Sequence, residues 1–180
     1  SWYRWSFFVP NDWVFDPMQT IVGQVHAEPP AGAGWGNPPL AVHLKNNKVS
    51  LTSDWGPAAA DEISFELGDI RRGEWHDILI KSTWSTGSNG QLNAWFNGSQ
   101  KAQRSGQNIA VGNANGDRTP FFKASIYADW RWDRDNSTSY LKGVLIDDVK
   151  IGDSNETYAS MDFVGGRTSQ NMEVRTFDTK

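Results

Sequence analysis

The sequence predicts an all-β protein built as a sandwich or jelly roll. Short segments with strand-like alternation of apolar and polar residues recur along the chain, and clusters of turn-forming residues separate them. No segment combines a sustained helical period with a capped apolar face. The chain has 180 residues, which is enough for one domain with a substantial core. We therefore expect one β-sandwich domain over residues 1–180.

The predicted strands are the segments in which apolar residues recur at every second position. They cover residues 1–10, 19–27, 40–44, 48–52, 62–67, 75–84, 91–96, 121–130 and 140–151. Pro10-Asn11-Asp12 and Asn97-Gly98 are turn signals that end two of them. Segment 101–118 is polar and rich in Gly and Asn, so we expect a loop there, and the tail to Lys180 has little pattern.

The predicted strand 121–130 has one apolar face and one face with chemically useful groups. Because successive side chains of a strand point to opposite faces, Lys123 and Tyr127 project from the same side. Phe122 and Ile126 lie on the other side. A cation and a phenol on one sheet face indicate a site for an anionic, hydroxyl-rich substrate.

Two other predicted strands carry polar pairs at the same spacing. Gln24 and His26 share a face of one strand, and His43 and Lys45 share a face of another. Arg4, from the first strand, is a further candidate for this group. If these faces line the concave side of one sheet, they form a groove of amide, imidazole, ammonium and phenol groups.

Such a groove suits β-elimination from a uronic-acid polysaccharide. The reaction needs neutralisation of the C5-linked carboxylate, removal of the C5 proton and protonation of the leaving O4. An amide or a cation stabilises the developing charge, His or Tyr can act as the base, and Tyr can act as the acid. Hydrolysis instead needs two positioned carboxylates. The cluster of Asp61, Glu62 and Glu66 does not place all three on one strand face, so we disfavour hydrolysis.

Composition excludes several other classes of protein. The net charge of -4 and the pI near 5.3 argue against a general nucleic-acid binder. No apolar run approaches the length of a membrane span, so no membrane partner is expected. The absence of cysteine excludes disulfides and thiolate metal sites.

The 10 tryptophans favour a core of large rings, but they also allow a second hypothesis. In that hypothesis the protein is a non-catalytic carbohydrate-binding module or lectin, and Trp35, Trp55 and Trp130 stack on sugars. Trp35 lies in the long Pro-, Gly- and Ala-rich segment 28–39, which is typical of a binding loop. A third alternative is a structural domain of a larger surface protein.

Several motifs occur together in an order that resembles a known family. A hairpin is formed by Trp75-His76-Asp77-Ile78-Leu79-Ile80-Lys81, Trp84-Ser85, Gly90 and Ala94-Trp95-Phe96-Asn97-Gly98. Around it lie Gly23-Gln24-Val25-His26, Pro39-Leu40-Ala41-Val42, Phe122-Lys123-Ala124-Ser125-Ile126-Tyr127 and Asp147-Asp148-Val149-Lys150-Ile151-Gly152. The set is similar to the heparin lyase I-like polysaccharide lyases, a superfamily that includes the glucuronan lyases. The resemblance covers the chain from Trp2 to about Tyr158.

The resemblance implies a concanavalin A-like β-jelly roll of two antiparallel sheets with a concave substrate groove. It implies that the protein cleaves a glucuronan-like polysaccharide, with Gln24 neutralising the carboxylate and His26 acting as a base or orienting the substrate. Tyr127 and Tyr140 are implied as the acid, or as acid and base in one. No cofactor is required. Some relatives hold a structural Ca²⁺, for which Asp147 or Asp148 would supply oxygen ligands.

The sequence also leads to expectations about the N-terminus, the cellular location and the oligomeric state of the protein. No signal peptide opens the chain, and the Arg- and Glu-bearing strand of the family is absent before Trp2, so we expect that N-terminal residues are missing. Three Asn-X-Ser/Thr patterns support a secreted protein. We expect a monomer whose partner is an anionic polysaccharide.

Overall fold

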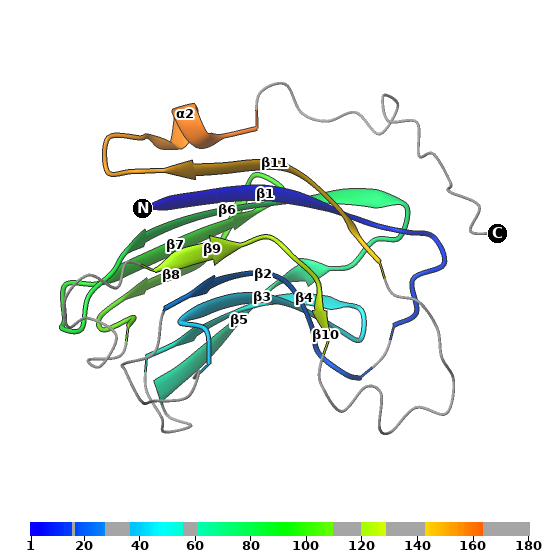
Figure 1. Ribbon diagram of the computed structural model, residues 1–180, viewed down its shortest axis with the longest axis horizontal. Coiled ribbons are helices and arrows are strands. Elements are labelled where there is room, and N and C mark those ends of the chain that lie inside the picture. Colours follow the sequence, from blue (N-terminus) through cyan, green and yellow to red (C-terminus); the bar gives the residue numbers. More distant parts are fainter. Residues whose placement is uncertain (16, 28–36, 56–60, 110–119, 129–142, 164–180) are drawn as a thin grey trace.

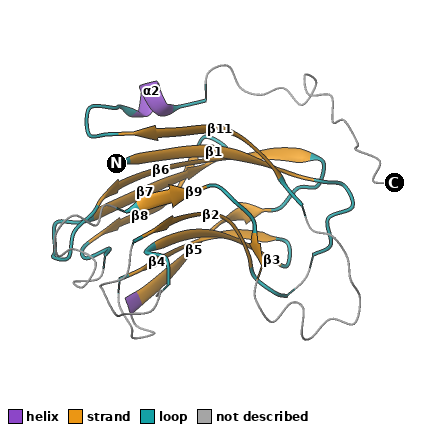
Figure 2. Ribbon diagram, in the orientation of Figure 1, coloured by secondary structure: helices purple, strands orange, loops and turns teal. Residues whose placement is uncertain are grey.

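The computed structural model describes residues 1–15, 17–27, 37–55, 61–109, 120–128 and 143–163. Within these ranges the chain forms two antiparallel sheets that pack face to face (Figures 1 and 2). The predicted all-β sandwich is therefore confirmed. Within the same ranges, no helix has the length and apolar character needed to cross a membrane.

The first sheet has five strands in the order β11-β1-β6-β7-β8. Its strands are β1 (Trp2–Val9), β6 (Glu74–Thr83), β7 (Gln91–Phe96), β8 (Ser99–Ser105) and β11 (Leu145–Gly152). Strand β1 pairs along its whole length with β6 on one side and with β11 on the other. The N-terminal strand is thus held inside this sheet.

The second sheet has six strands, and β2 organises one side of it. The strands are β2 (Thr20–His26), β3 (Leu40–Lys45), β4 (Lys48–Asp54), β5 (Glu62–Asp69), β9 (Phe121–Lys123) and β10 (Tyr127–Ala128). Strands β3, β4 and β5 follow β2 in order, while β9 and β10 pair with different parts of its other edge. The strands bend along their length in Figure 1, so the outer face of this sheet is concave.

The core between the sheets is built from alternate residues of each strand. In β1, Tyr3, Trp5, Phe7 and Val9 point inward and are almost fully buried. They meet apolar residues of the second sheet, among them Val22, Val25, Leu40, Val42, Leu44, Val49 and Leu51. Burial of these side chains is the main force that holds the two sheets together.

Gly23 lets the indole of Trp5 lie directly on β2. A Cβ atom at Gly23 would come within 2.5 Å of Cζ2 of Trp5, which is closer than real carbon atoms approach. Because Gly23 has no side chain, the indole of Trp5 can pack directly against the strand that carries Gln24 and His26. This contact fixes how the candidate site sits on the core.

The structure differs from the predicted elements in four places. Residues 99–105 form β8 where a loop was predicted from 101 onward, because an edge strand needs only one core residue, here Ala102. Residues 158–161 form a short helix, α2, which is too short to show a helical period. The predicted strand 121–130 is divided into β9 and β10, and 140–151 gives a strand from Leu145 onward. Residues 129–142 lie outside the described ranges.

Candidate active site

The register of the six-stranded sheet brings Gln24 and Lys123 together on its outer face. Gln24 is directly opposite Lys123 of β9 on one side and Ala41 of β3 on the other. Their neighbours Val25 and Phe122 point inward to the core, so Gln24 and Lys123 point outward. Side chains in such opposite positions have Cβ atoms about 5 Å apart. The amide and the ammonium group can therefore act on the same substrate carboxylate.

His26 lies one strand step further along the same face. Its ring stacks on Phe121 with 6.0 Å between centroids, and it is mostly buried. Nδ1 lies 3.0 Å from both the backbone N and the carbonyl O of Ala27. Burial, and to a smaller degree the nearby Lys123, hold the pKa of His26 below its usual value. The imidazole of His26 is therefore neutral at neutral pH. A neutral imidazole can accept a proton as a base, or donate a hydrogen bond that orients the substrate.

His43 occupies the middle of the face, on β3. Its Nε2 is 2.8 Å from Oγ1 of Thr52 on β4, while Nδ1 is buried without a hydrogen-bond partner. Burial lowers the pKa of His43 to about 4. Because only 5% of the residue is exposed, His43 forms part of the floor beneath a substrate rather than a freely reachable group.

Tyr127 and Lys45 are the exposed members of the predicted group. Tyr127 of β10 is directly opposite Ile21 of β2, which is in turn opposite His43, so the phenol belongs to the same outer face. It is 54% exposed, and it lies about 10 Å along the sheet from Gln24. Lys45 is exposed at the end of β3. The structure thus gathers Gln24 and His26 with the other predicted residues on this face, which are His43, Lys45, Lys123 and Tyr127.

Arg4 is not part of this group, and its prediction as a companion of Gln24 is corrected here. Because Tyr3 and Trp5 point into the core, Arg4 projects from the outer face of the opposite sheet. Its guanidinium donates to the carbonyl oxygens of Asp148, Met161 and Asp162. Alternation predicted on which side of its own strand Arg4 lies, but it could not show to which of the two sheets that strand belongs.

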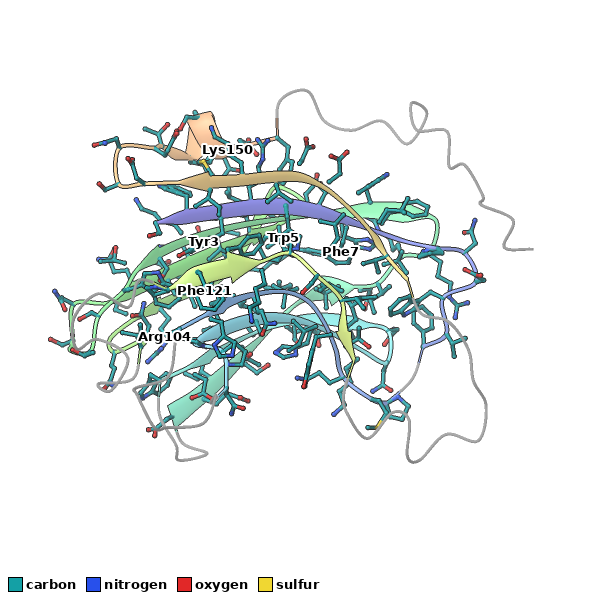
Figure 3. All side chains as sticks on the ribbon, viewed as in Figure 1. Tyr3, Trp5, Phe7, Arg104, Phe121 and Lys150 are labelled. Atoms are coloured by element: carbon teal, nitrogen blue, oxygen red, sulfur yellow. The ribbon has the colours of Figure 1, made fainter. Side chains whose placement is uncertain are left out.

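The remaining predicted residues fall into two groups. Tyr140 and Trp35, and the stacking candidate Trp130, lie outside the described residues. Trp55, the third candidate for stacking, has the guanidinium of Arg104 over its ring at 3.7 Å. Arg104 is labelled in Figure 3. One face of this indole is therefore covered by protein.

Asp147 and Asp148 lie on β11, at an irregularity in its pairing with β1. Asp148 has a positive φ of 53°, and its N–H donates to Oδ1 of Asp147 at 2.7 Å. Among the residues that the structure describes, no three acidic or histidine side chains gather into a metal-binding group. Calcium at Asp147 or Asp148 therefore stays a prediction, and no step of the reaction is assigned to it.

Two residues of the outer face were missed by the sequence reasoning. Phe121 stacks on His26, and Thr52 holds His43. Phe121 precedes Lys123 by two positions, so strand alternation already placed it on the polar face. Thr52 could be found only from the pairing of β3 with β4, which sequence periodicity does not give.

Comparison with known protein families identifies the family of this chain. The family model described as polysaccharide lyase matches residues 1–150, which include every residue of the outer face described above. The chain belongs to the polysaccharide lyase family. This confirms the resemblance seen in the sequence. No curated protein matches the chain.

Solved structures of other polysaccharide lyases share the fold. An endo-β-1,4-glucuronan lyase from the fungus Trichoderma reesei superposes with a TM-score of 0.69 and 23% identity, over 89% of this chain and 70% of that one. An alginate lyase from Pseudomonas aeruginosa gives a TM-score of 0.54 and 20% identity, over 84% of this chain. The present chain spans 63% of that alginate lyase. At these identities, the likeness shows a common fold.

Proposed function

We propose that this polysaccharide lyase cleaves a uronic-acid polysaccharide of the glucuronan type by β-elimination. The observation that carries the proposal is the pairing of Gln24 with Lys123, beside neutral His26 and on the same concave face as Tyr127. An amide and a cation at one point suit a carboxylate, and a phenol beyond them suits proton transfer. Solved structures with the same fold include a glucuronan lyase and an alginate lyase, which supports this substrate class.

In the proposed reaction each group has one task. Gln24 and Lys123 bind the C5-linked carboxylate and stabilise the negative charge that develops when C5 loses its proton. His26 or Tyr127 takes that proton, and the electron pair of the C5–H bond forms the C4=C5 double bond. The C4–O4 bond then breaks, and Tyr127 or Tyr140 protonates O4. No water enters the products, which distinguishes the reaction from hydrolysis.

The activity is tested directly with defined polymers. The protein is incubated separately with glucuronan, alginate, heparin and hyaluronan, and the ultraviolet absorbance of the conjugated C4=C5 double bond is followed. We expect a rise with glucuronan. If none of the four polymers gives a rise while the protein stays folded, the proposal is wrong, and retention of a polymer on the folded protein would then favour a binding module.

A further inference from the structure

The charge of the outer face changes sign from one edge of the six-stranded sheet to the other. In β2, β3, β9 and β10 the charged residues are Lys45 and Lys123, because burial lowers the pKa values of His26 and His43 and keeps both imidazoles neutral. At the opposite edge, β4 and β5 carry four carboxylates, which belong to Asp54, Glu62, Glu66 and Asp69. The candidate site therefore has a cationic side and an acidic side.

Pairing shows that the acidic groups share the face of the candidate site. Glu62 is opposite Asp54, and Glu66 is opposite Ser50, which is itself opposite His43. Phe65 pairs with Leu51 and packs on the core. Glu66 follows Phe65 directly and Glu62 lies three positions before it, so alternation points both glutamates outward. Both glutamates are exposed.

One described lysine contacts two carboxylates of the acidic edge. Lys48 contacts Glu66 and Asp69, each at 2.8 Å, and a single ammonium group cannot cancel two carboxylates. Asp54 accepts a hydrogen bond from the side-chain amide of Asn37 at 2.9 Å. Glu62 lies beside Asp54 in the register, so two carboxylates meet at one end of the edge.

The curvature of the sheet indicates how a polymer meets both sides. Strand β2 bends along its length in Figure 1, so a rod-like chain follows the concave face when it lies across the strands. Neighbouring strands are about 4.8 Å apart, which is roughly the length of one sugar unit. A uronate held by Gln24 and Lys123 on β2 and β9 therefore places sugars two or three units away over β4 and β5.

We infer that, among uronic-acid polysaccharides of the glucuronan type, this face favours those in which a uronate bound at β9 and β2 is followed, toward β5, by uncharged sugars. This inference rests on the proposed function. Glu62 is its specificity-determining residue, because its exposed carboxylate repels a uronate carboxylate placed over β5. A polymer with a carboxylate on every sugar is bound less well than one with interspersed neutral sugars.

The test compares two forms of one polymer, so that linkage and length stay constant. Glucuronan is used intact, and after chemical reduction of about half of its carboxyl groups to neutral glucose, on the ground that one proposed subsite discriminates by charge. Formation of the C4=C5 double bond is followed at low and at high salt. We expect kcat/KM per remaining uronate to be roughly two- to fivefold higher for the reduced polymer at low salt. At 1 M salt the difference should vanish, because charges about 3 Å or more apart are then screened.

The variant Glu62→Gln removes the acidic charge and should remove the preference. Its matched control is Glu74→Gln on β6 of the other sheet, which changes the net charge equally and should keep the preference. Equal kcat/KM for both polymers in the wild type would overturn the inference, as would a Glu62→Gln variant that behaves like Glu74→Gln. Absence of product from both polymers would instead refute the proposed function.

Discussion

At the scale of single residues, the site depends on side chains whose environments differ sharply. His26 and His43 are buried and held neutral, whereas Tyr127 is 54% exposed on the same face. A group that exchanges protons with a large polymer must be reachable, and Tyr127 meets this condition. The floor residues in turn need fixed positions, which Phe121 and Thr52 provide.

Replacement of Tyr127 by Phe should remove activity without loss of the fold. The phenol is exposed, so stability should change by less than about 0.5 kcal/mol. Loss of its proton transfer should lower kcat about 10²- to 10⁴-fold. The measurement is the initial rate of double-bond formation on glucuronan, with unfolding followed by circular dichroism.

Tyr158→Phe is the matched control for this variant. Tyr158 packs against Trp95 on the outer face of the other sheet, far from the proposed substrate. The initial rate of the Tyr158→Phe variant should therefore equal that of the wild type. A Tyr127→Phe variant that keeps full activity would remove Tyr127 from the reaction and leave the activity itself in place.

At the scale of elements, β2 joins the core to the site. Its inward residues contact Trp5 and the other core rings, and its outward residues are Gln24 and His26. Both neighbours of its edge, β9 and β10, contribute a site residue through pairing with it. A change that shifts β2 on the core should therefore affect stability and activity together.

Gly23→Ala tests this coupling. The new Cβ would meet the ring of Trp5 at 2.5 Å, so either the indole or β2 must move. We expect a loss of about 1–3 kcal/mol in the free energy of unfolding, together with reduced kcat/KM. Urea denaturation and the glucuronan assay measure the two effects. Gly87→Ala, where the nearest atom is 3.8 Å away, is the control and should leave both unchanged. An unaltered Gly23→Ala protein would show that β2 is not fixed by this contact.

At the scale of the whole molecule, two buried histidines make stability depend on pH. His43 on the outer face and His76 in the core both have their pKa lowered to about 4, mainly by burial. His76 stacks between Phe7 and Phe96, and its Nε2 accepts the N–H of Arg71 at 3.0 Å. Protonation of Nε2 would remove that hydrogen bond.

The sign of the pH effect follows from proton binding. Between pH 6.5 and 4 the unfolded chain binds protons at these histidines and the folded protein does not, so stability falls as the pH falls through this window. Each histidine should contribute a loss of at most about 3 kcal/mol. Urea unfolding from pH 7 to pH 4.5 measures the effect, and His43→Gln should reduce its slope. Equal slopes for the variant and the wild type would contradict a buried neutral His43.

The fold and most of the site could be predicted because alternation reports which face of a strand a residue occupies. It placed Gln24 with His26 on one face of β2, as the structure has them. Lys123 and Tyr127 lie on that face too, but through separate pairings of β9 and β10 with β2 and not through one continuous strand. Alternation is silent about which strands are neighbours, so Arg4 was grouped with the wrong sheet. The contact between Thr52 and His43 also depends on strand pairing. Edge strand β8 was missed because only Ala102 marks its inner face.

Elimination and hydrolysis of a polysaccharide give products of different mass. The masses of the two products released from one defined glucuronate oligosaccharide therefore distinguish the two reactions. Elimination adds no water, so we expect the two product masses to sum to the mass of the substrate, with an unsaturated residue at the new non-reducing end. A sum that exceeds the substrate mass by one water would show hydrolysis and would contradict the account.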